Sequence, residues 1–174
     1  MAPTSIDGTE ITGATIDGQD VSEITVDGET VFTAIPDSTV SRSDDNKSTG
    51  NNNGSSLGMA FKSTKEWSKI QAVVSAISTD LDTAYLYDSS GNVLYSTSIL
   101  NKNPGEEFTI DYTIQPDTEY SIEVDGGSIG YNGSESFPQT NAEGDLTLTN
   151  TSRDGDFGAV NDPGGIVTIG NISL

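Results

Sequence analysis

The chain has 174 residues and a formal net charge of -20 at pH 7, with 27 acidic residues, 7 basic residues and no histidine or cysteine. This balance argues against nucleic acid and anionic membrane surfaces as partners, because both require a basic patch. Without histidine and cysteine the chain can form no Ser-His-Asp triad, thiol nucleophile, disulfide or histidine-ligated metal centre.

The acidic excess is suited to concentrated salt. At about 1 M salt the Debye length is roughly 3 Å, so repulsion between carboxylates is largely screened. The alternative, a disordered acidic chain, conflicts with the regular strand patterns described below. The first residues also lack the charged leader and apolar segment of a secretory signal.

Three similar segments stand ten residues apart at the N-terminus, namely Ile6-Asp7-Gly8, Ile16-Asp17-Gly18 and Val26-Asp27-Gly28. Asp-Gly between β-branched residues is a strong signal for a two-residue turn, because both residues tolerate positive φ. We therefore expect a short β-hairpin repeat over residues 1–36, with Ile24 opposite Val31 in the third hairpin.

Such short hairpins are marginal in water by themselves. The repeat therefore predicts docking or oligomerisation, that is, an assembly and anchoring segment. The candidate assembly residues are the apolar ones of the repeat: Ile16, Val21, Ile24, Val26, Val31 and Phe32.

Residues 37–56 follow Ile35-Pro36 and are rich in Asn, Ser and Gly. Proline removes a backbone donor and restricts the residue before it, so a boundary is expected here. We expect residues 37–56 to form a polar linker or a long surface loop.

From residue 57 to residue 174 the apolar residues alternate with polar ones. Phe108 and Ile110 alternate with Thr109, and Ile122 and Val124 flank Glu123. This period of two predicts strands, and their number and spacing predict an all-β fold, an antiparallel jelly-roll-like β-sandwich.

One segment fits two structures. In residues 67–77, Ile70, Val73, Val74 and Ile77 have the spacing of an amphipathic helix. As a strand, the same segment would place Ile70, Ala72, Val74 and Ala76 on one face. The β-branched content and the β context favour the strand.

Sugar binding would use aromatic rings flanked by amides or carboxylates. The candidate glycan-binding residues are Tyr85, Tyr87, Tyr131 and Asn132. A bound cation would use carboxylate and amide oxygens from a glycine-rich loop. The candidate metal-binding residues are Asp154, Asp156, Asn161 and Asp162.

Both sets have plainer explanations, since exposed tyrosines are common on strands and acidic loops are common in so anionic a chain. No cofactor is required by any pattern, and a structural calcium or monovalent cation is the open alternative. With 27 acidic residues, a chance pair of carboxylates carries no information about hydrolysis. We expect no enzyme and no catalytic residues.

The run from Ala84 to Gly91, together with Trp67 before it and Pro116–Tyr120 and Phe137-Pro138 after it, resembles β-sandwich modules in structural proteins of haloarchaeal tailed viruses. Residues 21–32 resemble the N-terminal segments of such proteins. The resemblance implies a tail fibre, baseplate or capsid turret protein of an extracellular particle that is assembled in the host cytoplasm. It also implies a homo-oligomer in contact with other virion proteins. The alternatives are a module that binds host-surface glycan and a stand-alone secreted lectin or glycosidase.

Overall fold

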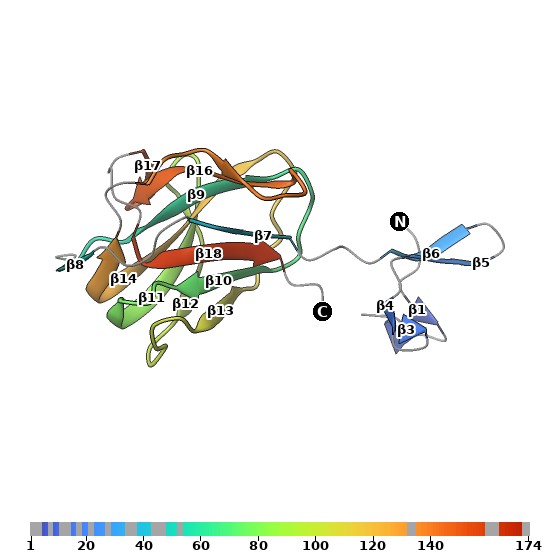
Figure 1. Cartoon of the computed structure of the whole chain (residues 1–174), viewed down its shortest axis with the longest axis horizontal. Coiled ribbons are helices and arrows are strands. Elements are labelled where there is room, and N and C mark those ends of the chain that lie inside the picture. The colour runs from blue at the N-terminus through green and yellow to red at the C-terminus, as the bar shows by residue number, and fades with distance from the viewer. Residues whose placement is uncertain are drawn as a thin grey trace. The chain divides into compact units, whose positions relative to one another are not determined.

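The computed structural model describes residues 5–6, 9–10, 15–16, 19–20, 23–26, 29–33, 38–42, 48–51, 54–131, 135–158 and 164–171. For the residues before 38, for 48–51 and for 131 and 171, it describes the backbone only. Every regular element in this part of the chain is a β-strand, and every strand pair is antiparallel (Figure 1). The all-β prediction is therefore confirmed.

The chain divides into two compact units, one of residues 1–37 with 172–174 and one of residues 38–171. The first unit holds three two-stranded pairs, and the two strands of each pair are separated by one of the Asp-Gly steps. The pairs are β1 (Ser5–Ile6) with β2 (Thr9–Glu10), β3 (Thr15–Ile16) with β4 (Gln19–Asp20), and β5 (Glu23–Val26) with β6 (Glu29–Thr33).

The Asp-Gly steps and Val21 lie outside the described residues, so the turn type stays a prediction. In the third pair Ile24 lies opposite Phe32, and the register shifts between Ile24 and Thr25. The predicted pairing of Ile24 with Val31 is therefore wrong, because a bulge adds one residue to β6. The proposed role of this unit in assembly stays a prediction.

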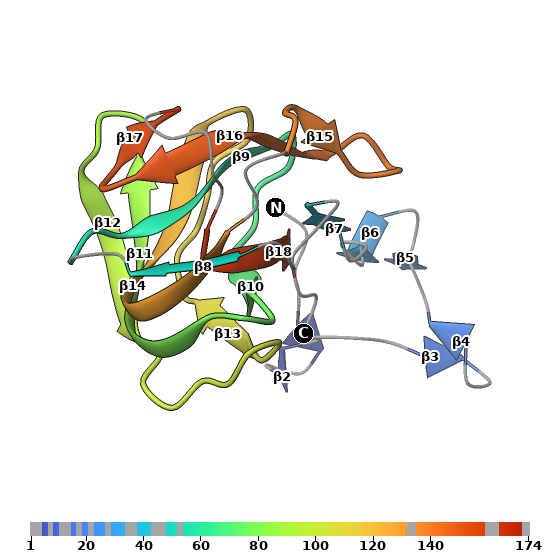
Figure 2. The same cartoon turned by 60° about the vertical axis from the view of Figure 1, so that its left-hand side comes forward.

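The second unit contains two sheets, which Figure 2 shows as two layers. The smaller sheet has the order β13–β10–β18–β7. Its strands are β7 (Ser38–Ser41), β10 (Ile70–Val74), β13 (Glu107–Ile110) and β18 (Ile166–Asn171).

The larger sheet has the order β12–β11–β14–β9–β16–β15, with β8 paired to β14 and β17 paired to β16. Its strands are β8 (Ser48–Asn51), β9 (Leu57–Ser63), β11 (Thr79–Asp88), β12 (Val93–Ser98), β14 (Glu119–Tyr131), β15 (Gln139–Thr140), β16 (Leu146–Arg153) and β17 (Asp156–Phe157). This is a β-sandwich-like arrangement, and the jelly-roll detail stays a prediction.

Residues 67–77, whose spacing fitted both a helix and a strand, contain strand β10. In β10 the buried residues are Ile70, Ala72 and Val74, which share one face, and β13 and β18 pair with its two edges. Pairing on both sides satisfies the backbone and overrides the helical spacing. The strand ends at Val74, and Ala76 is exposed, contrary to the expectation that it would share the buried face.

The segment expected to be a linker, residues 37–56, contributes two strands to the sheets. In β7, Ser38 and Val40 are buried and Thr39 and Ser41 are exposed, and the strand pairs with β18. Strand β8 pairs with the end of β14. The sandwich therefore begins at residue 38 and not at residue 57. Composition was misleading here because a small serine can be buried once its hydroxyl has a partner.

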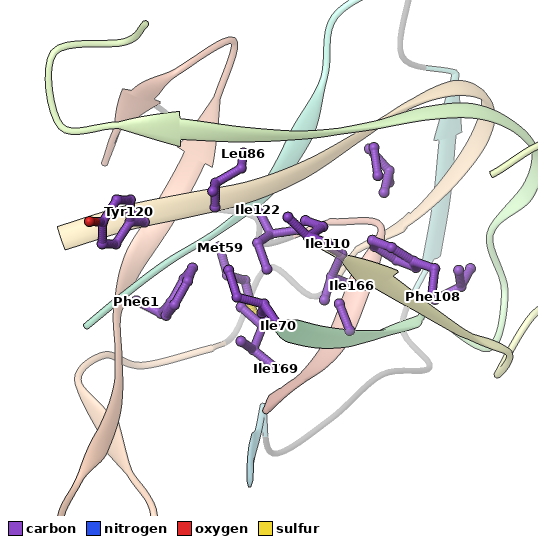
Figure 3. Packing of buried hydrophobic residues seen from close by; sticks show 14 of the residues in the cluster. Met59, Phe61, Ile70, Leu86, Phe108, Ile110, Tyr120, Ile122, Ile166 and Ile169 are labelled. Atoms are coloured by element: carbon purple, nitrogen blue, oxygen red, sulfur yellow. The ribbon is translucent and has the colours of Figure 1, made fainter. Parts of the chain in front are cut away.

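The core lies between the two sheets, as Figure 3 shows for the labelled residues of both layers. Ile70, Phe108, Ile110 and Ile169 of the smaller sheet face residues of the larger sheet. The contribution of the larger sheet includes Met59, Phe61, Leu86, Tyr120 and Ile122. In β10 and β13 the buried positions match the alternation that was read from the sequence. In β9 the residues from Gly58 to Phe61 are all buried, so both faces of this strand are removed from water.

Candidate functional site

A buried glutamate lies on the face of the larger sheet that points away from the core. In β14, Ile122 and Val124 belong to the core, so the side chain of Glu123 between them points to the other face. The relative exposure of Glu123 is nevertheless 0%. A fully buried carboxyl is rare and needs hydrogen-bond partners.

Three donors meet the Glu123 carboxyl. The hydroxyl of Ser56 donates to Oε2, the hydroxyl of Ser121 donates to Oε1 at 3.1 Å, and the backbone N–H of Gly155 donates to Oε1 at 3.0 Å. The hydroxyl of Ser152 is also buried and lies near enough to lower the pKa of Glu123, although it makes no hydrogen bond among the described residues. None of these partners is a cation.

The turn between β16 and β17 covers this carboxyl. Asp154 and Gly155 have φ values of 50° and 79°. The carboxylate of Asp154 accepts a hydrogen bond from the backbone N–H of Ser56 at 2.8 Å, and this bond holds the turn over the sheet. A Cβ on Gly155 would lie 2.8 Å from the ring of Tyr87 and 2.9 Å from the Cα of Gly91. Glycine is therefore required at position 155 both for its φ and for the close approach.

Burial raises the pKa of Glu123, and the hydrogen bonds from Ser56, Gly155 and Ser121 oppose that effect without cancelling it. Burial also raises the pKa of Tyr87, whose hydroxyl lies 3.3 Å from the hydroxyl of Ser56. This arrangement can hold a proton on Glu123 at a higher pH than an exposed carboxyl could. Because Glu123 has no exposed surface, it fits a structural polar cluster and not a site that a substrate reaches.

The tyrosines expected to bind glycan lie beside this cluster. The ring centroids of Tyr85 and Tyr87 are 5.9 Å apart. Tyr85 is half-buried, and its hydroxyl donates to Asp125 at 3.0 Å, whereas Tyr87 is only 8% exposed. Tyr85 therefore retains a ring surface, and Tyr87 has little left for stacking. The side chain of Tyr131 and the whole of Asn132 lie outside the described residues.

Asp125 was not predicted as a glycan-binding residue, although a carboxylate beside the Tyr85 ring makes this position more suitable for sugar binding. Its other oxygen accepts the backbone N–H of Thr83 at 2.9 Å, which fixes the carboxylate. The period of two places Glu123 and Asp125 on the same face of β14, next to the tyrosines of β11. That pattern could have identified Asp125 once the pairing of the two strands was known.

Of the residues expected to bind a cation, Asp154 and Asp156 lie at the β16–β17 turn. Asp154 accepts the backbone N–H of Ser56, and Asp156 is an exposed residue of β17. Asn161 and Asp162 lie outside the described residues. Among the described residues, no three carboxylates converge in a way that could hold a metal ion. The cation site stays a prediction.

A second buried carboxyl, Asp145, was not among the residues predicted from the sequence. It lies in a polar cluster with Ser38, Lys65 and Asn141, where β7 meets the β15–β16 turn. Lys65 Nζ lies 2.6 Å from Oδ2, and the side chains of Ser38 and Asn141 both donate to Oδ1. Burial by itself would raise the pKa of Asp145, but Lys65, Ser38 and Asn141 together lower it to about 2. Asn141 also accepts the backbone N–H groups of residues 145 and 146, which closes the turn.

A cleft of about 500 Å³ lies at the start of β11 and the 100–104 loop. None of the sequence-predicted site residues lines it. The described part of the chain contains no helix of the length and apolarity needed to span a membrane.

No protein-family model matches the chain, and no curated protein matches it either. Its function is therefore inferred from its own sequence and geometry.

Proposed function

We propose that this chain is a virion structural protein of a halophilic tailed virus, which displays its sandwich on the tail or capsid surface. The observation that carries the proposal is the division into two units of different character. One unit is a sandwich with an extensive core, and the other consists of two-stranded pairs.

The N-terminal pairs are too small to be stable independently. Strands of two to five residues, paired only two by two, leave most of their backbone edges without a neighbouring strand within the described pairs. Contacts with a neighbouring subunit or another virion protein would complete them. This is the reason to assign anchoring and homo-oligomerisation to residues 1–36.

The sandwich has the properties of a displayed module. Among the described residues its buried carboxyls, Glu123 and Asp145, hold loops and strands together, and concentrated salt screens the repulsion that a net charge of -20 produces. This combination supports a structural role at the surface of a particle.

The test is the incorporation of a shortened chain into particles. A chain that lacks residues 1–34 and the full chain are each produced in infected cells, and particles purified by density are analysed by mass spectrometry. We expect the full chain in the particles, and the shortened chain folded in the cytoplasm but excluded from them. Incorporation of both chains would refute the anchoring role, and absence of both would refute the virion assignment.

Host-surface glycan binding is the second candidate, and the Tyr85–Asp125 pair favours it. A half-buried ring beside a fixed carboxylate is a combination that recognises sugar faces and hydroxyls. We expect any glycan bound by the full chain on an array in concentrated salt to be lost with Tyr85→Ala. Thr109→Ala, at an exposed position of β13 in the smaller sheet, is the control and should leave binding unchanged. Equal binding by both variants would exclude Tyr85 as the site.

A further inference from the structure

We propose that strand β12 pairs edge to edge with β12 of a second copy of this chain, so that the larger sheets of two copies continue into one another. Strand β12 lies at one end of the larger sheet, with β11 as its single paired strand among the described residues. Its six residues include no charged residue and no proline, although 20% of the chain is charged. An edge strand without these features is an open template for strand addition.

The other described edges differ from this one. Strands β15 and β17 have two residues each, which is too short for stable pairing with another chain. The edge strand β13 contains Glu107 and follows Glu106, so it carries negative charge. Strands β7 and β8 have four residues each. Strand β12 is thus the longest described edge and is uncharged throughout.

The hydrogen-bond pattern shows which backbone groups of β12 face outward. Residues 83 and 98 are opposite one another, and the N–H of Ile99 donates to the carbonyl of Asp82 at 2.9 Å. In an antiparallel ladder, hydrogen-bonded pairs alternate with pairs that are not hydrogen-bonded. Pairs 84–97 and 86–95 therefore bond within the sheet, and the N–H and C=O groups of Ser96 and Ser98 point away from β11.

Two exposed apolar side chains flank the strand. Val93 is 52% exposed and Leu100 is 60% exposed, and these are the two large hydrophobic residues with exposed side chains among the described residues. One begins β12 and the other lies two residues after its end. Exposed apolar side chains at both ends of an uncharged edge indicate a contact surface.

A twofold axis at Ser96 satisfies all of these features at once. Antiparallel pairing about this axis places Ser96 opposite Ser96 of the second copy, so that their outward N–H and C=O groups bond reciprocally. Tyr95 then lies opposite Thr97 of the second copy, an aromatic and β-branched pair on one face. The same register brings Val93 next to residues 99 and 100 of the other copy, where Leu100 is exposed.

The self-complementary placement of Val93 and Leu100 at the two ends of β12 makes a second copy the fitting occupant, and the uncharged strand permits the approach. Two copies with a net charge of -20 each repel one another, and the repulsion is smallest where an uncharged strand faces the same uncharged strand. Salt screens the remaining repulsion. We therefore expect a dimer that strengthens as the salt concentration rises. The pairing involves the sandwich alone and does not depend on the N-terminal unit or on the virion assignment.

Because the chain contains no cysteine, a single introduced one reports directly on the register. Ser96→Cys in the full chain should give a disulfide-linked dimer with copper phenanthroline as oxidant, since a hydrogen-bonded antiparallel pair has Cα atoms within disulfide range. The matched control is Thr109→Cys, an exposed position on edge strand β13, which should stay monomeric on a non-reducing gel. Absence of the Ser96→Cys dimer, or equal cross-linking at both positions, would overturn the proposal.

A second measurement needs no cross-link. In sedimentation equilibrium of the full chain in concentrated salt, Ser96→Pro should weaken dimerisation at least about tenfold, because it removes the outward N–H and keeps every bond to β11. Ser96→Lys should weaken it similarly, whereas Thr109→Lys should leave it unchanged. Thermal unfolding by circular dichroism confirms that each variant is folded. A wild-type chain that stays monomeric, or a dimer that resists both Ser96 variants, would refute the pairing.

Discussion

Glu123 and Asp145 are both buried carboxyls of one sandwich, yet their surroundings shift their pKa values in opposite directions. Asp145 has a cation, Lys65, at 2.6 Å and a lowered pKa of about 2. Glu123 has two hydroxyls and one backbone N–H as donors, with no cation among them, and burial raises its pKa. Burial of a carboxyl therefore does not fix its charge. The partners decide whether the charged form is favoured.

Protonation of Asp145 and protonation of Glu123 therefore change the stability of the fold in opposite directions. The lowered pKa of Asp145 stabilises the fold above pH 3.8, and this contribution is lost as the pH falls towards about 2. The raised pKa of Glu123 has the reverse effect. The contribution of protonated Glu123 to the stability of the fold is present below pH 4.5 and is lost as the pH rises through the raised pKa.

The largest expected effect is that of Glu123→Leu. The change leaves two buried hydroxyls and the N–H of Gly155 without their acceptor, which should lower the free energy of unfolding by about 3 kcal/mol. Chemical denaturation in concentrated salt at pH 7 measures it.

Glu123→Gln is the matched control, because it keeps the shape and an acceptor oxygen but cannot ionise. We expect it to be as stable as the wild type or more stable at neutral pH, with the difference shrinking below pH 4.5. A Gln variant as unstable as the Leu variant at pH 7 would mean that the ionised carboxylate is required.

Asp145→Asn should have a smaller effect, about 2 kcal/mol at pH 7, because the neutral amide oxygen accepts from Ser38 and Asn141 more weakly than the carboxylate does, and Lys65 also loses its partner. The loss should disappear as the pH falls from about 4 to about 2, where the wild-type carboxylate is protonated as well. Thermal unfolding of both proteins across this range measures it. A difference that stays constant with pH would contradict the assigned pKa.

Lys65→Met should have the smallest effect, below about 1 kcal/mol, since the lysine side chain is 42% exposed and its attraction to Asp145 is screened. The effect should shrink further between low and high salt. Lys62→Met in β9, three residues earlier in the chain, is the control for the loss of a positive charge. If Lys65→Met costs as much as Asp145→Asn in concentrated salt, the ion pair and not the neutral donors holds the turn.

Much of the sandwich could be predicted from alternation alone. The strands around Phe108, Ile122 and Leu148 could be identified because the apolar residues that face the core recur with a period of two in the sequence. The choice of a strand for Ile70–Val74 was also correct, although the helical spacing fitted equally well. The β-branched residues of this segment favoured the strand over the helix.

The candidate sites were much harder to predict. Asp145 meets Ser38 across 107 positions of the chain, and Glu123 meets the N–H of Gly155 across 32. No local pattern contains such pairs, because they depend on which strands become neighbours. The strand at Ser38–Ser41 was missed for the same reason, since its partner β18 lies near the C-terminal end of the sequence, with Ser41 and Thr168 127 positions apart.

The sequence by itself determined the all-β class, the identity of most core strands and the strong negative charge, because each follows from local alternation or from composition. Only the tertiary structure decided where the sandwich begins, that Glu123 and Asp145 are buried, and that the uncharged strand β12 lies at an open edge among the described residues. These depend on long-range strand pairing, which sets both the neighbours of a side chain and its exposure to water.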